Sequence, residues 1–291
     1  MGNSLREVKA RINSTRSTAQ ITKAMYMVSQ SKVKKAEKTY KMYKDFMAGI
    51  SSLVSQVVEK AGEDYEHPLL AKREIKKTGY LIITSDRGLA GAYNSNICKA
   101  LTEKINERHE SKDEIITASI GKQGFYYLKK MGYPLLTEKP TLVRDDVIFA
   151  DIAPLAKSLI DLYIQNEIDE LVVIYNHYIN SLSQEIKYQQ LLPIGQIDGE
   201  ASSIDYVYET GIAKTLDLVL PMYIQDIVYG IILDAKTSEH SARMNSMRNA
   251  TDNAEEVIDK LQLLYNRARQ SVVTNELIDI IGGANAIGGD K

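Results

Sequence analysis

Cysteine is almost absent from this chain of 291 residues, and long hydrophobic runs are missing. The one cysteine, Cys98, has no partner for an internal disulfide, so the sequence favours a reducing compartment. No apolar run approaches the roughly 18–20 residues that a membrane-spanning helix needs. The first residues carry charges at Arg6, Glu7 and Lys9, where a signal peptide would need an apolar stretch. A cytosolic or a peripheral membrane protein is therefore expected.

Proline is missing from both ends of the chain. All six prolines lie between Pro68 and Pro221, and each flank, residues 3–61 and residues 222–281, contains a single glycine. Globular helices usually run about 10–14 residues. Flanks of this length without a helix breaker therefore predict two unusually long helices around a punctuated middle.

Apolar residues in both flanks alternate at steps of three and four, which is the spacing of a coiled-coil seam. The predicted seam residues are Val33, Ala36, Tyr40, Tyr43, Met47, Ile50, Val54 and Val57 in the first flank, and Met247, Ala250, Ala254, Val257, Leu261, Leu264 and Ala268 in the second. An ordinary bundle helix has the same spacing, but neither flank has a stop signal for over fifty residues. We therefore expect an antiparallel coiled coil of residues 1–60 with residues 206–287, and an inserted domain at residues 75–200.

The seam becomes less regular toward both tips. Between residues 5 and 30 the apolar positions drift: they are Leu5, Val8, Ile12, Ile21, Met25 and Val28. Near the C-terminus they are distributed all round the predicted helix: they are Leu277, Ile278, Ile280, Ile281 and Ile287. Apolar side chains on every side of a helix imply burial on every side. Either a larger core or another protein is expected to enclose this tip.

The middle of the chain alternates between strand and helix patterns. The predicted strands are Tyr80–Thr84, Glu114–Ile120, Glu170–Tyr178 and Tyr188–Leu192. The predicted helices are a stretch that ends near Glu110, Lys122–Lys130 and Ala150–Glu167. This alternation predicts a three-layer α/β domain with a largely parallel sheet. The acidic stretch from Gly195 to Pro221 is expected to connect it to the second long helix.

The sequence contains neither of the two common glycine-rich phosphate-binding motifs. The best candidate for a phosphate loop is Asp86–Gly91, between a predicted strand and a predicted helix, where backbone amides favour anions and Arg87 could assist. The charge of Asp86 opposes that role, so a structural turn is favoured. The four histidines are isolated, and the pair Asp145 and Asp146 is expected to be solvated. No motif indicates catalysis, a metal site or a cofactor.

Charge is unevenly distributed along the chain. Residues 1–44 hold eleven Lys or Arg and two acids, for a charge of +9, and the remaining 247 residues hold 25 and 36, for −11. The lysines that flank the first seam are Lys32, Lys34, Lys35, Lys38, Lys41 and Lys44. A solvated face is as good an interpretation as a binding surface. Nucleic-acid binding is disfavoured because the whole chain has a pI of about 6.2.

Several stretches resemble the gamma subunit of F-type rotary ATP synthases. They are Arg6–Ile12, Ile21–Ser29, Ser85–Gly91, Ser238–His240, Arg243–Met244, Asn249–Ala254, Leu263–Gln270, Thr274 and Gly283–Ala284. These stretches occur in the family's order and spacing at both ends and in the middle. The central motif departs from the family pattern, since Ala90 stands where Cys is common and Ala92-Tyr93 replaces the common Gly-Leu.

The resemblance implies a rotor shaft and a Rossmann-like foot domain. In that family the coiled coil lies inside a hexamer of three alpha and three beta subunits, with one gamma subunit to each hexamer. The foot domain lies with the epsilon subunit on the membrane c-ring, and the shaft couples ion transport, often hydrogen ion transport, to ATP synthesis or hydrolysis. The resemblance further implies a non-catalytic peripheral subunit on the cytoplasmic face of the bacterial cell membrane. No cofactor, nucleic acid or small-molecule substrate is implied, and the coupling ion stays open.

The resemblance also assigns contacts with the alpha/beta hexamer by position. The implied contact residues are Lys23, Met25, Lys32, Lys34, Lys35, Arg87, Arg243, Arg269, Gln270 and Thr274. The apolar tip, Leu277–Ile287, matches the end that is seated in a hydrophobic sleeve of the hexamer. Two alternatives remain: a coiled-coil scaffold that binds acidic protein partners, and a nucleotide-binding enzyme that uses the turn Asp86–Gly91.

Overall fold

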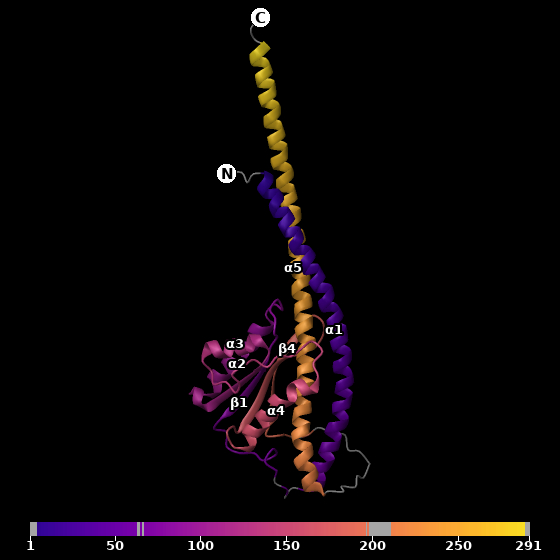
Figure 1. Ribbon diagram of the computed structural model, residues 1–291, viewed down its shortest axis with the longest axis vertical. Coiled ribbons are helices and arrows are strands. Elements are labelled where there is room, and N and C mark those ends of the chain that lie inside the picture. Colours follow the sequence, from indigo (N-terminus) through magenta and orange to yellow (C-terminus); the bar gives the residue numbers. More distant parts are fainter. Residues whose placement is uncertain (1–4, 63–64, 66, 196, 198–210, 289–291) are drawn as a thin grey trace. The chain divides into compact units, whose positions relative to one another are not determined.

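The computed structural model describes residues 5–62, 65, 67–195, 197 and 211–288 (Figure 1). The chain divides into a smaller unit of residues 1–28 and 244–291 and a larger unit of residues 29–243. Two long helices, α1 (Leu5–Ala61) and α5 (Ile212–Gly288), contribute to both units. Three parts of the sequence predictions lie outside the described residues. They are the shaft at positions 1–4 and 206–210, the end of the inserted domain at 196 and 198–200, and the side chain of Ile287.

In the smaller unit, α1 and α5 pack against each other in opposite directions. Val8 and Ile12 of α1 form a buried cluster with Leu261 of α5. Further along α1, Thr22 Oγ1 lies 2.8 Å from Thr251 Oγ1 of α5. Because a higher position on α1 meets a lower position on α5, the pair is antiparallel, as predicted.

The position of the seam on α5 differs from the prediction. Val257 and Leu264, both predicted seam residues, are 44% and 56% exposed. Ile258 and Tyr265, one residue later in each case, pack against the cluster of Val8, Ile12 and Leu261. The buried or half-buried face therefore follows Met247, Thr251, Ala254, Ile258, Leu261, Tyr265 and Ala268.

A polar residue explains this difference. Thr251 is buried at 7% exposure, and a pattern that counts only apolar residues passes over it. Its hydroxyl donates to the Met247 carbonyl oxygen at 2.8 Å and also meets Thr22. A hydroxyl with such partners can be buried in a helix interface at little cost, so the seam continues through a threonine.

The N-terminal half of α1 does not drift. Eight buried or half-buried positions keep the alternation of three and four: they are Val8, Ile12, Thr15, Ala19, Thr22, Tyr26, Ser29 and Val33. Leu5, Met25 and Lys32 are half-buried beside them. Ile21 and Val28, which the sequence placed among the apolar positions, are 60% and 55% exposed. The predicted irregularity was wrong because small and hydroxyl-bearing residues occupy the seam here.

The larger unit contains a sheet of four strands in the order β2-β1-β3-β4. The strands are β1 (Thr78–Ile83), β2 (Ile115–Ile120), β3 (Glu170–Tyr178) and β4 (Gln184–Leu192). β1 pairs parallel with β2 and β3, and β4 pairs antiparallel with β3. The largely parallel sheet is confirmed. β4 begins at Gln184 rather than at the predicted Tyr188, because its pairing with β3 starts where Gln184 meets Tyr178. The short connection after β3 allows only an antiparallel hairpin.

Helices cover both faces of this sheet. They are α2 (Tyr93–Arg108), α3 (Lys122–Met131) and α4 (Phe149–Ile164), with a short 3-10 turn at Lys112–Glu114. Tyr80 and Ile82 point to the face that α2 and α3 cover. Leu81 and Ile83 point to the other face, where α4, α1 and α5 pack. The alternation of side chains along β1 thus produces the predicted three layers.

Within the larger unit, α5 lies between α1 and the sheet (Figure 1). Every residue from 231 to 241 is buried. On one side Tyr43 of α1 donates its hydroxyl to the Asp226 carbonyl oxygen at 2.9 Å. On the other side Tyr93 of α2 donates its hydroxyl to the Ala235 carbonyl oxygen at 3.0 Å. This stretch of α5 is enclosed on all sides, which an amphipathic surface helix is not.

The start of α5 corrects a second prediction. The helix begins at Ile212, after Gly211 with φ +84°, and Pro221 lies inside it. Proline removes one backbone donor, but Leu220 and Ile224 on either side are fully buried in the core and offset that loss. By length and hydropathy (mean hydropathy 1.6), α5 could cross a membrane, yet 44% of its apolar window is buried inside the protein. One such helix is weak evidence for a membrane span.

Candidate functional site

The central turn, Ser85–Gly91, is held by its own domain. Asp86 Oδ1 accepts a hydrogen bond from the backbone N–H of Lys122 at 3.1 Å, and Oδ2 accepts one from the N–H of Val143 at 3.4 Å. Lys122 is the first residue of α3. A carboxylate of the chain itself therefore occupies a helix N-terminus, where an external anion would otherwise be favoured.

Close packing supports the same conclusion. A Cβ atom at Gly121, where φ is +92°, would lie 2.1 Å from the Thr84 carbonyl oxygen, and one at Gly124 would lie 2.4 Å from Ser119 Oγ. The start of α3 thus contacts the ends of β1 and β2 with no space for a side chain on that side. Asp86, the first residue of the stretch Asp86–Gly91, therefore has a structural role.

Arg243 of α5 lies beside this turn. Its Nη2 donates to the Arg87 carbonyl oxygen at 3.3 Å and lies 2.8 Å from Glu239 Oε1. Glu239 is 4% exposed and also accepts from Lys236 Nζ at 3.0 Å. Burial raises the pKa of Glu239, but the Lys236 and Arg243 cations outweigh it and hold the pKa below its ordinary value. Arg243, which the resemblance places among the partner contacts, thus also links α5 to the turn.

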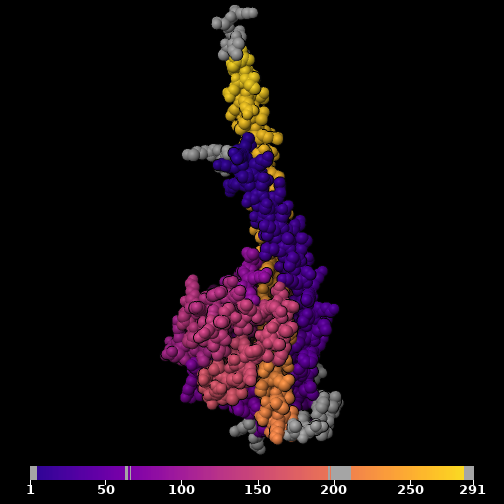
Figure 2. Space-filling model, in the orientation of Figure 1, coloured from indigo at the N-terminus to yellow at the C-terminus, as the bar shows by residue number. Residues whose placement is uncertain are grey.

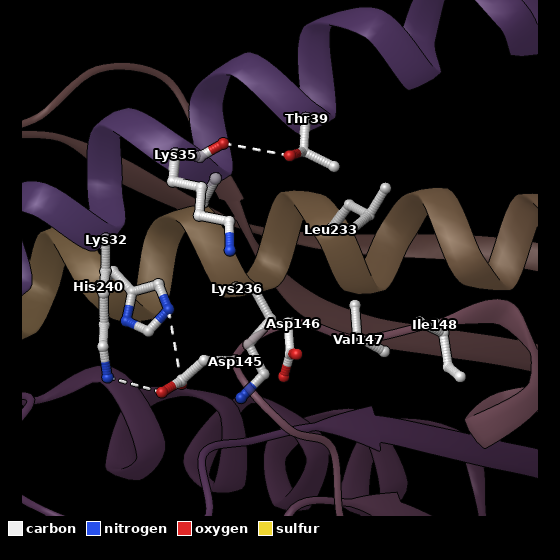
Figure 3. A pocket seen from close by; sticks show the side chains of 11 residues that line it. Lys32, Lys35, Thr39, Asp145, Asp146, Val147, Ile148, Leu233, Lys236 and His240 are labelled. Carbon is white, nitrogen blue, oxygen red and sulfur yellow. Dashed lines mark hydrogen bonds and ion pairs between the residues drawn. The ribbon is translucent and has the colours of Figure 1, made fainter.

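A cavity of about 430 Å³ lies between α1, α5 and the loop before α4 (Figure 3). Lysines from both helices line it together with Asp145 and Asp146 of the loop. Lys32 Nζ lies 2.6 Å from Asp145 Oδ2, and His240 Nε2 lies 3.6 Å from Asp145 Oδ1. Although burial raises the pKa of Asp145, the hydrogen bond from Lys32 lowers it below its ordinary value. Asp145 and Asp146 are both exposed, as the sequence predicted, and Asp145 in addition lies against both helices.

The structure separates the predicted basic contacts into two kinds. Lys32 is already paired with Asp145, with 38% of its side chain exposed. Lys23, Lys34 and Lys35 are exposed, and none of them forms an ion pair with another residue in the described part of the chain. Met25 is half-buried. The exposed lysines are the ones whose charge is available to a partner.

The predicted contacts on α5 beyond the seam are all exposed. Arg269, Gln270 and Thr274 lie in a stretch, residues 269–284, in which every side chain is exposed. This stretch includes large apolar residues: Val272, Val273, Leu277, Ile278, Ile280 and Ile281 are 41–67% exposed. We call residues 269–284 the apolar tip; it is drawn in yellow and is uncovered on the face shown in Figure 2. No described residue of this chain supplies the larger core, and such an apolar surface marks a site of interaction.

A buried polar cluster that the sequence analysis missed joins α1, β3 and α5. Asp234 of α5 is 2% exposed and accepts from the Tyr178 backbone N–H at 2.8 Å. His177 Nδ1 lies 2.5 Å from Asp234 Oδ2, and the Tyr178 hydroxyl donates to Glu37 of α1. We call these four residues the Asp234 cluster. No sequence signal could have found it, because its members belong to three elements that lie far apart in the sequence.

The described residues offer few candidates for acid–base catalysis or for metal binding. No group of three or more His, Cys, Asp or Glu side chains within them is arranged to hold a metal ion. Cys98 is buried in α2, and burial raises the pKa of its thiol to about 11. A thiol with that pKa stays protonated and is a poor nucleophile at neutral pH.

Comparison with known proteins gives one consistent result. The family model that matches is described as ATP synthase and covers residues 4–287. A chain in the central stalk and c-ring structure of Tetrahymena thermophila mitochondrial ATP synthase is 24% identical, with a TM-score of 0.62, over 79% of this chain and 99% of that one. A chain in the OSCP/F1/c-ring structure of Euglena gracilis mitochondrial ATP synthase, rotational state 3, is 20% identical, with a TM-score of 0.67, over 99% of this chain and 96% of that one. Both solved chains share the fold described above.

Proposed function

Because this chain belongs to the gamma-subunit family of F-type ATP synthases, we propose that its two long helices turn inside a hexamer of three alpha and three beta subunits. As a member of that family it is a central-stalk rotor subunit. Torque passes through such a subunit between a membrane ring and the catalytic hexamer. The proposal concerns which surfaces of this chain make the contacts.

The apolar tip is the observation that carries the proposal. Residues 269–284 expose six large aliphatic side chains, among them Ile280 at 67% exposure. Burying apolar surface stabilises a complex by about 25 cal/mol for each Å², so a water-filled surrounding is unfavourable for this helix end. Aliphatic side chains cover most of the circumference of this helix end. This suits a sleeve in which the helix turns, since most rotational angles present an apolar surface to the wall.

Polar contacts are proposed at the start of the tip and along α1. Arg269, Gln270 and Thr274, all exposed, would meet the catalytic subunits where α5 leaves the coiled coil. Lys23, Lys34 and Lys35 would pass acidic loops of the beta subunits. An exposed ion pair contributes only about 0–1 kcal/mol. Weak and distributed pairs suit a rotor, because a deep electrostatic minimum at one angle would stall rotation.

The α/β domain is proposed as the foot that meets the epsilon subunit and the membrane c-ring. We assign this chain no active site, cofactor or small-molecule substrate of its own. The N-terminus of α3, which could otherwise bind an anion, is occupied by Asp86. The complex would lie on the cytoplasmic face of the bacterial cell membrane, with this chain as a peripheral subunit. Ion selection, for H⁺ or Na⁺, would lie in the membrane ring.

Co-expression with alpha and beta subunits tests the proposal. We expect a complex of one copy of this chain with three alpha and three beta subunits, measured by native mass spectrometry. A chain that ends at Gln270 loses most of the apolar tip, while the buried cluster of Val8, Ile12 and Leu261 stays intact. Its complex should dissociate more readily, whereas replacing Lys34 and Lys35 with alanine should leave the complex intact.

The opposite pattern would favour the alternative. A coiled-coil scaffold that binds acidic proteins depends on its lysines and has no use for the apolar tip. Loss of binding in the lysine variant, together with full binding in the truncated chain, would therefore contradict the rotor assignment of these surfaces. Circular dichroism of both variants checks that each retains its helices.

A further inference from the structure

The Asp234 cluster lies where α5 is most deeply enclosed. Asp234 is in the stretch of residues 231–241 that is buried at every position. β3, which supplies His177 and Tyr178, is an inner strand that pairs with both β1 and β4. The β1 ladder ends at Ile174, whereas the β4 ladder continues to Tyr178. A force on the sheet therefore reaches these two residues along β3 and through the β4 ladder.

The cluster fixes the end of β3 to α5 by directed bonds. Asp234 Oδ1 accepts a hydrogen bond from the backbone N–H of Tyr178, and Oδ2 lies 2.5 Å from His177 Nδ1. A hydrogen bond to a carboxylate is about twice as strong as one between neutral groups and is sensitive to angle. Apolar packing, which covers most of this face, is not directional. The carboxylate therefore resists sliding and rotation of α5 against the sheet more than its apolar neighbours do.

The same strand end also contacts α1. The Tyr178 hydroxyl donates to Glu37, and the Tyr40 hydroxyl, one turn further along α1, lies 3.4 Å from Asp234 Oδ2. A neighbouring hydrogen bond also attaches α5 to this end of the strand: the Ser241 hydroxyl donates to the Ser181 carbonyl oxygen in the β3–β4 connection at 2.7 Å. One end of one strand is thus joined to both long helices at the same level.

We propose that the Asp234 cluster is the joint through which load passes between the α/β domain and the two long helices. Asp234, His177, Tyr178 and Glu37 act as positioning residues, because they hold the foot and shaft in a fixed rotational relation and touch no reacting group. The inference rests on the proposed rotor function. It goes beyond it by naming where, inside this chain, torque is transmitted.

Two substitutions remove the joint in different ways. Tyr178→Phe deletes only the hydroxyl that reaches Glu37. Asp234→Leu deletes the carboxylate at nearly constant volume, and Asp234→Asn keeps one oxygen as acceptor for the Tyr178 N–H. The matched control is Tyr127→Phe, which deletes a hydroxyl 2.7 Å from Thr102 Oγ1 inside the α/β domain.

The experiment uses the complete complex in lipid vesicles. The rate of ATP synthesis under an ion gradient measures transmission under load, and ATP hydrolysis by the same complex with the gradient dissipated measures turnover without load. We expect the ratio of synthesis to hydrolysis to fall by roughly 2- to 30-fold in Tyr178→Phe and Asp234→Leu, the range for substitutions in packed coupling networks. Asp234→Asn should recover part of the ratio, and Tyr127→Phe should keep the wild-type ratio.

The outcomes separate the joint from the rotor function itself. A wild-type ratio of synthesis to hydrolysis in either Tyr178→Phe or Asp234→Leu would refute the proposal that the Asp234 cluster transmits the load. If Asp234→Leu fails to assemble, Tyr178→Phe decides, since it removes one oxygen atom from a folded chain. An equal fall in Tyr127→Phe also overturns the joint, because it shows a general effect of lost hydroxyls. If the wild-type chain supports no coupled synthesis, the proposed function fails instead.

Discussion

Two leucines one turn apart on α5 allow a sharp test of the coiled-coil register. Leu261 is 9% exposed and packs in the cluster with Val8 and Ile12, whereas Leu264 is 56% exposed. The apolar pattern of the sequence places both in the seam, and the structure places only Leu261 there. Replacing each with alanine makes the same chemical change on the same helix, so their difference reports burial alone.

The expected cost follows from that burial. A buried Leu→Ala change costs about 2–5 kcal/mol, and a narrow interface of two helices favours the lower end, about 2 kcal/mol. Leu264→Ala removes mostly exposed surface, and alanine is the better helix former, so its effect should stay within about 0.5 kcal/mol. The two variants should therefore differ about tenfold or more in the equilibrium for local opening.

Amide hydrogen exchange of the full-length chain measures this opening directly. In Leu261→Ala, exchange should accelerate in peptides that cover residues 5–22 and 251–268, and peptides from the sheet should be unchanged. In Leu264→Ala both regions should exchange at the wild-type rate. Equal acceleration in the two variants, or a larger effect at Leu264, would restore the register predicted from the sequence and refute the structural one.

Three further predictions concern the larger unit and the basic face. Asp86→Ala should lower the thermal stability of the α/β domain by about 0.5–2 kcal/mol, because the N–H groups of Lys122 and Val143 lose their acceptor; an unchanged melting temperature would contradict this. Burial holds the pKa of His240 at about 4, below its ordinary 6.5, so the unfolded chain binds a proton that the folded chain does not. Stability should therefore fall by up to about 3 kcal/mol as the pH drops from 6.5 to 4, and denaturant titrations of His240→Gln should show a flatter profile. Lys34→Ala should leave assembly intact and change ATP turnover by less than about fivefold, since an exposed pair contributes at most about 1 kcal/mol; loss of assembly would contradict this.

Periodicity predicted the elements well where one physical signal dominated. β3 was predicted at Glu170–Tyr178 and has those bounds, because a run of buried apolar residues has few other interpretations. α3 ends at Gly132 with φ +65°, a left-handed position that glycine adopts without strain. Local composition was sufficient in both cases.

Prediction failed where tertiary contacts decided the outcome. Thr251 belongs to the seam only because Thr22 meets its hydroxyl, and no local pattern contains that information. Pro221 would end most helices, but here the buried neighbours hold the helix together.

The predicted contact surfaces also divide into features that the sequence could predict and features that depend on the fold. The exposed apolar tip could be predicted, since apolar residues on all sides of a helix end are visible in the sequence. The pairing of Lys32 with Asp145 and the contact of Arg243 with the Arg87 carbonyl oxygen could not, because each joins residues more than a hundred positions apart in the sequence. A resemblance assigns a residue to a surface, whereas the fold decides whether its charge is still available.

Rotation of this chain relative to the hexamer is the most direct test of the central claim. A fluorescent probe on the exposed face of the α/β domain, with the alpha and beta subunits fixed to a surface, reports the angle of the shaft in single complexes during ATP hydrolysis. The account predicts stepwise rotation in one direction that stops when ATP is removed. A probe that stays at one angle while the same complexes hydrolyse ATP would contradict it.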